Sequence, residues 1–310
     1  MLKKNEFSGV FTAVVTPFNR NDEIDLDNLG LLIRSQMDDG VNGILLAGTT
    51  GEGPMLSLSE IEEIIGYTVD LTRDKDLIIM AGTGCVSIKD TLAITRRAFE
   101  LGVDAVVTLP PYYLKKITSP GLIAYYDRIM SEAVPDGKHM FVYDIPQITG
   151  ITMEMGFFEG LLKLQEQKFC GVKDSIGDFA HSQDLIQRFP GLRVMIGTDK
   201  LLLKGLQTGA AGSITAGTNV LASYASRVYR AFIQGDLDEA QQLQEKLTAA
   251  RSVLEKFTPF SIGLKSLLAH RFKTANWELR LPLLPLSLSE RESLIQMLKE
   301  LDLDASFAWL

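Results

Sequence analysis

Residues 169–175 read FCGVKDS, an apolar run that ends on a lysine and an aspartate. The stretch 169–172 has the composition of a strand that is buried on both faces. Lysine is among the residues least often buried, because moving an ammonium group out of water is costly. The position of Lys173 at the end of an interior strand therefore has to be explained, either by a structural ion pair with a strand-end carboxylate or by a chemical role of the amine.

Runs of this kind recur at residues 10–15, 43–46, 77–80, 105–109, 139–143, 169–172, 192–196 and 213–216. Helix-like segments separate most of them. In 57–74, Ser57 or Ser59 can cap the helix, and 87–102 closes on Gly102. Eight strand–helix units in about 220 residues match a (β/α)8 TIM barrel. The rival, a doubly wound open sheet, usually has G-x-G-x-x-G after its first strand, whereas here TPFNRND follows.

Beyond Asn219 the strand signals stop, and the segments that read as helices are 223–236, 237–257, 263–272 and 288–301. The stretch 276–287, NWELRLPLLPLS, interrupts them, because its prolines disfavour a helix. We expect a catalytic barrel of residues 1–222 and a C-terminal helical domain of residues 223–310.

Composition excludes several classes of protein. The 310 residues are 46% hydrophobic and 23% charged, which is typical of a globular protein, and the net charge of -8 argues against nucleic acid or an anionic membrane as partner. No signal peptide or membrane-spanning run is apparent. Two isolated cysteines, Cys85 and Cys170, favour the reducing cytoplasm. The three histidines are far apart, so we expect no metal, although distant carboxylates could still assemble a site.

In a barrel, the reacting groups lie at the C-terminal ends of the strands. Those ends carry hydroxyls and phenols around one lysine, in the stretches 16–17, 48–53, 110–113, 143–146, 173–175, 197–199 and 216–219. Burial disfavours the charged form of an amine, so Lys173 could act as a neutral nucleophile that forms a Schiff base with a carbonyl. Tyr143, on the preceding strand, could relay a proton, or it could simply be a buried tyrosine with a satisfied hydroxyl.

The turn GTTGEG, residues 48–53, could cradle a carboxylate with inward-facing N–H groups, or it could be only a turn before a capped helix. The pattern G-x-x-x-x-G-K-[ST] does not occur, which argues against a nucleoside triphosphate.

Six motifs occur in a familiar order: GVFTAVVTPF, GTTGEG, LPPYYLK, YDIPQITG, GVKDSIGD and LRLPLLPL. Together they resemble the pyruvate-dependent Schiff-base aldolase superfamily, which includes dihydrodipicolinate synthase, N-acetylneuraminate lyase and 2-keto-3-deoxygluconate aldolase. The resemblance covers the chain from about residue 8 to beyond residue 290. It implies a homotetramer built from two tight dimers, with no metal or organic cofactor.

The resemblance also implies a role for each matching position. Lys173 would form the imine with pyruvate, and Tyr143 would be the general acid and base. Thr49 and Thr50, in the turn that begins at Gly48, would hold the pyruvate carboxylate. Thr49 would also link Tyr143 to Tyr113, which would be inserted from a neighbouring subunit. The main-chain carbonyl of Ile214 would lie near the imine.

Departures from the family patterns narrow the range of substrates that we expect. Dihydrodipicolinate synthases usually carry an arginine where this chain has Ile148, and isoleucine cannot hold a carboxylate. N-acetylneuraminate lyases typically begin the turn with Ser-Thr and have an acidic residue where this chain has Lys200. Ser175 matches the hydroxyl that contacts the sugar acid in 2-keto-3-deoxygluconate aldolases. Asp144 stands where asparagine is common in the family, and the sequence predicts no particular effect of this difference on the substrate.

The sequence therefore predicts a class I lyase that reversibly cleaves a 2-keto-3-deoxy sugar acid to pyruvate and an aldehyde. The alternatives are a dihydrodipicolinate synthase-type condensation of pyruvate with an aldehyde, a keto sugar acid dehydratase, a metal-dependent aldolase, and a non-catalytic relative that binds a keto acid.

Overall fold

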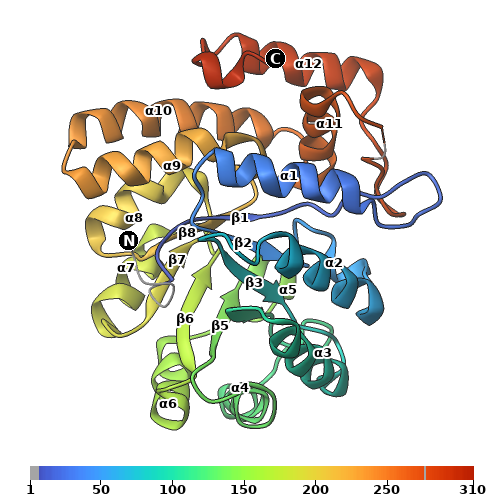
Figure 1. Ribbon diagram of the computed structural model, residues 1–310. Helices are drawn as coiled ribbons and strands as arrows, with labels where there is room; N and C mark the ends of the chain where they lie inside the picture. Colours follow the sequence, from blue (N-terminus) through green and yellow to red (C-terminus); the bar gives the residue numbers. More distant parts are fainter. Residues whose placement is uncertain (1–6, 276) are drawn as a thin grey trace.

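Eight parallel strands close into a barrel in the order of the chain (Figure 1). The computed structural model describes residues 7–275 and 277–310. The strands are β1 (Gly9–Ala13), β2 (Gly43–Leu46), β3 (Ile78–Gly82), β4 (Ala105–Thr108), β5 (His139–Asp144), β6 (Phe169–Asp174), β7 (Arg193–Ile196) and β8 (Gly212–Thr215). Each predicted run overlaps one strand, so the TIM barrel is confirmed and the doubly wound sheet is excluded.

The helices between the strands are α1 (Leu26–Asp38), α2 (Leu58–Leu71), α3 (Ile88–Leu101), α4 (Ser119–Ala133), α5 (Pro146–Thr149), α6 (Met155–Gln165), α7 (Phe179–Arg188) and α8 (Leu202–Thr208). Ser57, and not Ser59, caps α2, in a reciprocal box with Glu60. Gly102 ends α3 with a φ of 107°, a conformation that glycine adopts without strain.

Two apolar layers form the core, and they explain the near-continuous runs. One fills the barrel interior with side chains that include Phe11, Leu45, Met80, Phe141 and Met195. The other lies between the strands and the surrounding helices. Because successive strand residues point to opposite faces, β1 to β5 and β7 each contribute buried side chains to both layers.

The C-terminal part of the chain is helical, with α9 (Thr218–Gln234), α10 (Leu237–Leu254), α11 (Phe260–Phe272) and α12 (Leu288–Lys299). Figure 1 shows α10, α11 and α12 gathered on one side of the barrel. Asn276, at the start of the stretch predicted to be irregular, lies outside the described residues, and 279–287 contain no helix. The predicted boundary at residue 222 falls within α9, and the division into two domains stays a prediction.

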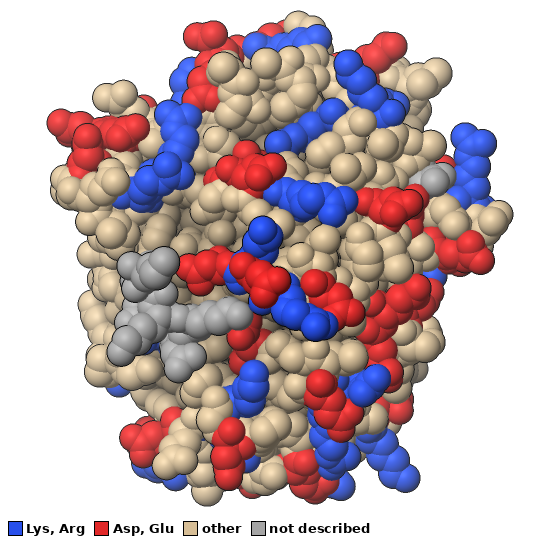
Figure 2. Space-filling view, in the orientation of Figure 1, with Lys and Arg blue, Asp and Glu red and all other residues tan. Residues whose placement is uncertain are grey.

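Two features of the structure concern the expected partners: the charges on the surface, and the length and apolar character of the helices. On the face seen in Figure 2, lysines and arginines alternate with carboxylates instead of gathering into one basic area. A search of the described helices finds none with the length and apolar character needed to span a bilayer. That nucleic acid is not a partner stays a prediction.

Candidate active site

Lys173 lies at the C-terminal end of β6 with its side chain inside the barrel. It pairs in register with Tyr143 of β5, and its Nζ lies 4.1 Å from the centroid of the Tyr143 ring. The two residues are 3% and 5% exposed. Val142 and Val172, one position earlier, belong to the outer apolar layer, which is the alternation that turns the amine and the phenol ring inward.

A cavity of about 520 Å³ opens above this pair. The predicted site residues that line it are Lys173, Tyr143, Thr49, Thr50, Ser175 and Ile214. They come from β5, β6, β8 and the turn after β2, which meet only because the barrel is closed. The fold thus brings together six of the eight predicted site residues.

The turn that follows β2 separates this cavity from a smaller one of about 290 Å³. Thr49 and Tyr143 line both cavities, whereas Gly48 lines only the smaller one. The Thr49 hydroxyl is buried and has no hydrogen-bond partner among the described residues. A buried hydroxyl without a partner is unfavourable, so its position between two cavities suits a ligand that would accept or donate a hydrogen bond there.

Tyr113 lies away from both cavities. It follows β4 and is 75% exposed, with Leu114 beside it 67% exposed. A single chain therefore does not connect Tyr113 to Thr49 and Tyr143. The predicted insertion of this tyrosine into a neighbouring subunit remains a prediction.

Ser175 occupies a space that Gly197 leaves free. A Cβ at position 197 would lie 2.1 Å from the Ser175 Oγ, so a side chain there would displace the hydroxyl. The backbone of Ser175 is fixed by its N–H, which donates to the Asp144 carbonyl over 2.9 Å, and by its carbonyl, which accepts from the Gln147 side chain over 2.5 Å. Gln147 and the exposed Ile148 also line the larger cavity.

The outer wall of the larger cavity comes from the C-terminal helices, which the sequence did not indicate. Arg251, Glu255 and Phe260 line it, together with Lys200. Arg251 donates to the buried Asp199 over 2.8 Å and Lys200 donates to Glu255, so the positive and negative charges are balanced. Arg251 and Glu255 belong to none of the six motifs in the sequence.

A cluster of titratable groups lies behind the site, on the outer face of the barrel. Asp144 and Asp174 each follow one of the inward pair, and both are buried. His181 of α7 lies between them, with Nδ1 3.1 Å from Asp174 and Nε2 3.9 Å from Asp144. Ser182 donates to Asp174 over 2.5 Å. Both Asp144 oxygens are buried and have no hydrogen-bond partner among the described residues.

The environment shifts the pKa of these groups. Burial, and then the charge of Asp174, raises the pKa of Asp144 to about 7, against a smaller opposing effect of His181. The pKa of His181 is also raised, because its hydrogen bond and charge interaction with Asp174 outweigh the effect of burial. Near neutral pH Asp144 thus holds part of a proton that a carboxyl group in water would have lost.

No three histidine, cysteine or carboxylate side chains within 7–275 and 277–310 are arranged to hold a metal ion. Cys85 and Cys170 are free thiols. Burial raises the pKa of the Cys85 thiol to about 11 and that of Cys170 to about 12, so neither is a ready thiolate near neutral pH.

This arrangement defines a class of enzyme. A buried amine faces a phenol inside a barrel-mouth cavity, beside a turn with an unpartnered hydroxyl. Such a set of groups can condense with a ketone and move a proton at the adjacent carbon, which is the chemistry of a lyase that works through an imine.

Comparison with known proteins identifies the family. Residues 6–301 match the dihydrodipicolinate synthetase family model, and the chain belongs to this family. An uncharacterized DapA-like lyase of Chloroflexus aurantiacus is 38% identical over 284 residues, which are 91% of this chain and 93% of that protein. A 4-hydroxy-tetrahydrodipicolinate synthase of Kosmotoga olearia is 31% identical over 292 residues, 92% of this chain and 95% of its own.

Among solved structures, a dihydrodipicolinate synthase of Acinetobacter baumannii complexed with pyruvate superposes with a TM-score of 0.87. It is 29% identical and covers 95% of this chain and 98% of its own. The chain is thus an enzyme, a pyruvate-dependent lyase of the aldolase class, as the six motifs predicted.

Proposed function

We propose that this enzyme cleaves a 2-keto-3-deoxy sugar acid to pyruvate and an aldehyde through an imine at Lys173. The observation that carries the proposal is the buried Lys173 amine, 4.1 Å from the centroid of the Tyr143 ring in a cavity of about 520 Å³. The cavity is large enough for a six-carbon acid and is closed at its inner end by the two reacting groups.

The proposed reaction begins when the neutral amine attacks the ketone, and the ketone oxygen leaves as water with both amine protons. Tyr143 gives its phenol proton to the imine nitrogen, which leaves a protonated imine and a phenolate. Thr49 and Thr50 hold the carboxylate, so that attack is effectively intramolecular. Tyr143 then takes the proton of the C4 hydroxyl, the C3–C4 bond breaks, and its electron pair moves toward the imine nitrogen to give an enamine and an aldehyde. Protonation of C3 and hydrolysis release pyruvate and restore the amine. The main-chain carbonyl of Ile214 lies near the imine.

The outer part of the cavity supports a hydroxylated substrate. Gln147, Ser175 and Thr198 present an amide and two hydroxyls, and the Lys200–Glu255 pair presents balanced charges. Groups of this kind exchange hydrogen bonds with several hydroxyls of one ligand. Ile148 borders the same space and offers nothing to a second carboxylate.

The second candidate is a synthase that condenses pyruvate with an aldehyde. The relative from Kosmotoga olearia, 31% identical, carries that name, and the first half of the chemistry would be the same. The two candidates differ only in the aldehyde partner, so the outer part of the cavity decides between them.

The proposal extends to the assembly and the compartment. The enzyme forms a homotetramer, a dimer of dimers, in which Tyr113 enters the site of a neighbour and Thr49 connects it to Tyr143. It acts in the cytoplasm without a metal or organic cofactor. The exposure of Tyr113 and the two free cysteines support these points.

The first test is reductive trapping. Purified enzyme treated with pyruvate and borohydride is expected to gain the mass of one reduced pyruvate adduct on the peptide that contains Lys173. Lys173→Ala is the control and should gain nothing. Trapping at another lysine, or none at all, would contradict the imine mechanism.

The second test measures pyruvate release from 2-keto-3-deoxygluconate, its galactonate epimer, N-acetylneuraminate and 4-hydroxy-2-oxoglutarate. Lysine-dependent cleavage of the first two supports the proposal. If pyruvate is trapped but none of the four is cleaved, the substrate assignment fails while the imine stands. Condensation of pyruvate with aspartate semialdehyde, and dehydration of a keto sugar acid, are then measured.

Replacing Ile148 tests how strongly this position limits the choice of aldehyde partner. Ile148→Arg is expected not to create synthase activity, because one arginine does not rebuild the rest of the outer cavity. The measurement is condensation with aspartate semialdehyde, with Ile148→Leu as the apolar control. Appreciable condensation by the unaltered enzyme would show that the isoleucine does not exclude this substrate.

A further inference from the structure

A buried ion pair joins the C-terminal helices to the turn that follows β2. The Lys265 Nζ of α11 lies 2.5 Å from a Glu52 oxygen, and the two side chains are 1% and 2% exposed. Moving both charges out of water is costly, so a buried ion pair is weak evidence that its two residues stabilise the fold. Its location suggests another role, because Glu52 directly follows Thr49, Thr50 and Gly51.

The turn itself is closely packed and strained. Glu52 has a φ of 57° and Ala47 a φ of 50°, the left-handed region that residues other than glycine avoid. A Cβ at Gly53 would lie 2.0 Å from the Ala47 carbonyl oxygen, so no side chain fits at that position. The Glu52 N–H donates to the Thr49 carbonyl over 3.2 Å. A shift of Glu52 would therefore move Thr49.

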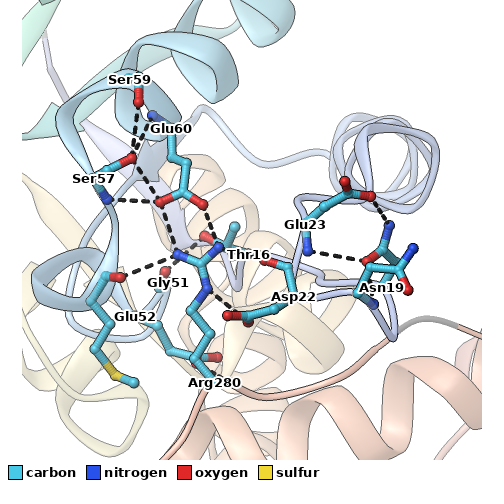
Figure 3. A network of polar contacts seen from close by, with 12 residues as sticks. Thr16, Asn19, Asp22, Glu23, Gly51, Glu52, Ser57, Ser59, Glu60 and Arg280 are labelled. Atoms are coloured by element: carbon cyan, nitrogen blue, oxygen red, sulfur yellow. Dashed lines mark hydrogen bonds and ion pairs between the residues drawn. The ribbon is translucent and has the colours of Figure 1, made fainter.

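A second contact holds the same carboxylate, because the backbone N–H of Arg280 donates to Glu52 over 3.2 Å. The Arg280 guanidinium donates to the Met55 carbonyl over 3.2 Å, to Asp22 over 3.0 Å and to Glu60 (Figure 3). The segment around Arg280 thus bonds to the chain on both sides of the turn.

Lys265 is fixed as firmly as its partner. Its Nζ also donates to the Glu278 carbonyl over 2.7 Å, and it lies 4.2 Å from the centroid of the Phe18 ring. Neither Lys265 nor Glu52 is among the described residues that line the two cavities. Any effect of the pair on the reaction must therefore pass through the turn.

We propose that Glu52 and Lys265, with the backbone of Arg280, are positioning residues that hold Thr49 and Thr50 where they bind the carboxylate of the keto acid. This inference rests on the proposed function, because it takes Thr49 and Thr50 as the carboxylate site. It makes the affinity for pyruvate depend on helix α11, outside the barrel.

The test uses the double variant Glu52→Gln with Lys265→Met, which removes both charges with little change of shape. The pyruvate concentration that half-saturates trapping is expected to rise about tenfold, since small displacements of a positioned group are costly. The trapping rate at saturating pyruvate should stay near that of the unaltered enzyme, because Lys173 and Tyr143 lie on other strands. Glu52→Gln alone, which keeps the lysine, should change in the same direction.

Lys246→Met is the matched control. Lys246 also ties C-terminal segments together, through the Leu301 and Asp302 carbonyls at 3.1 and 3.0 Å, but it is remote from the turn. Its half-saturating concentration should be unchanged. An unchanged value in the double variant, or an equal rise in the control, would overturn the inference. No trapping in the unaltered enzyme would instead contradict the proposed function.

The pH dependence gives a readout that does not depend on a variant folding. Burial lowers the pKa of Lys265 to about 8, against the raising effect of Glu52, and Arg280 and Glu278 are the other charged groups that face it. The half-saturating concentration should therefore rise above pH 8 in the unaltered enzyme. Because the folded protein holds this proton less tightly than the unfolded chain does, Lys265 causes no loss of stability over that range. A flat profile would contradict the inference.

Discussion

Lys173 and Asp174 are neighbours in the chain, yet they lie on opposite faces of the barrel wall. The same holds for Tyr143 and Asp144 on the adjacent strand. The amine and the phenol ring border the cavity, whereas the two carboxyls meet His181 beneath α7. Lys173 and Tyr143 are thus each followed by a buried acid on the other face of the same strand.

Removing the Tyr143 hydroxyl should separate imine formation from cleavage. Tyr143→Phe keeps the ring beside Lys173 but cannot move a proton, so cleavage is expected to slow by a factor of about 10² to 10⁴. Reductive trapping of pyruvate should persist. Tyr126→Phe is the control, because the Tyr126 hydroxyl is buried and, among the described residues, donates only to the Thr108 carbonyl, over 3.1 Å. Equal losses of turnover in both variants would show that the hydroxyl is only structural.

The Asp144 carboxyl should make stability depend on pH. Its pKa rises from 3.8 to about 7 on folding, so the folded protein binds this proton more tightly than the unfolded chain does. The free energy of unfolding should fall as pH rises from about 4 to about 7 and then level off. The raised pKa of His181 acts in the same direction, because its contribution is lost as pH rises through the folded-state value.

Asp144→Asn should flatten this dependence and raise the free energy of unfolding at pH 8 by about 2 kcal/mol. Urea denaturation at pH 5 and pH 8 measures both effects. Asp184→Asn is the control, since Asp184 is partly exposed and its one ion pair within the described part of the chain is with Arg188 on the same helix. If Asp144→Asn retains the slope of the unaltered protein, the carboxyl is not the group that titrates.

At the scale of elements, helices α2 and α12 begin in the same way. Ser57 and Ser287 each cap the helix, and the Glu60 and Glu290 carboxylates each accept a hydrogen bond from the backbone N–H of the capping serine. In α2 this carboxylate has a further role, because Arg280 donates to it and lowers the pKa of Glu60 to about 2. The cap of α2 therefore also anchors a segment some 220 residues away in sequence.

Ser57→Ala should lower the free energy of unfolding by about 1 kcal/mol, the usual effect of losing such a cap. The Glu60 N–H, which donates to Ser57 over 3.3 Å, would lose its partner. Ser59→Ala is a matched control, since Ser59 is exposed in the same turn and its only side-chain hydrogen bond to another described residue is with the Ser57 hydroxyl. Thermal or urea unfolding of the two variants makes the comparison. Similar losses would mean that the cap is not the cause.

The strands and the caps could be predicted because both are local features. Strands buried on both faces must be apolar throughout, and Ser57 with Glu60 has the spacing of a capping box. The outer wall of the cavity could not be predicted, since Arg251 meets Asp199 only after α10 has packed on the barrel. No local pattern distinguishes such a partner from solvent.

At the scale of the whole molecule, Tyr113 and Leu114 are two adjacent apolar residues that stay exposed on the single chain. Exposed apolar side chains that form a contiguous patch are one mark of a contact between proteins. The family resemblance predicted that Tyr113 enters a neighbour, and a single chain leaves that prediction open.

Tyr113→Ala should lower the rate of pyruvate release about tenfold, without altering circular dichroism or the unfolding transition of the subunit. Sedimentation velocity of the unaltered enzyme should show a tetramer. Dilution that dissociates it should reduce activity in parallel. Leu281→Ala, another exposed apolar residue, is the control. A fully active monomer would contradict a shared site.

Two different parts of the chain form the cavity, and this affects how the substrate range of such an enzyme can diversify. The strands supply Lys173 and Tyr143, whereas Arg251, Glu255 and Phe260 come from the helices that follow the barrel. Substitutions in α10 and the start of α11 can therefore alter which carbon chain is accepted without disturbing bond making and breaking. Selection for a different substrate would act on one part of the chain while the other is inherited unchanged.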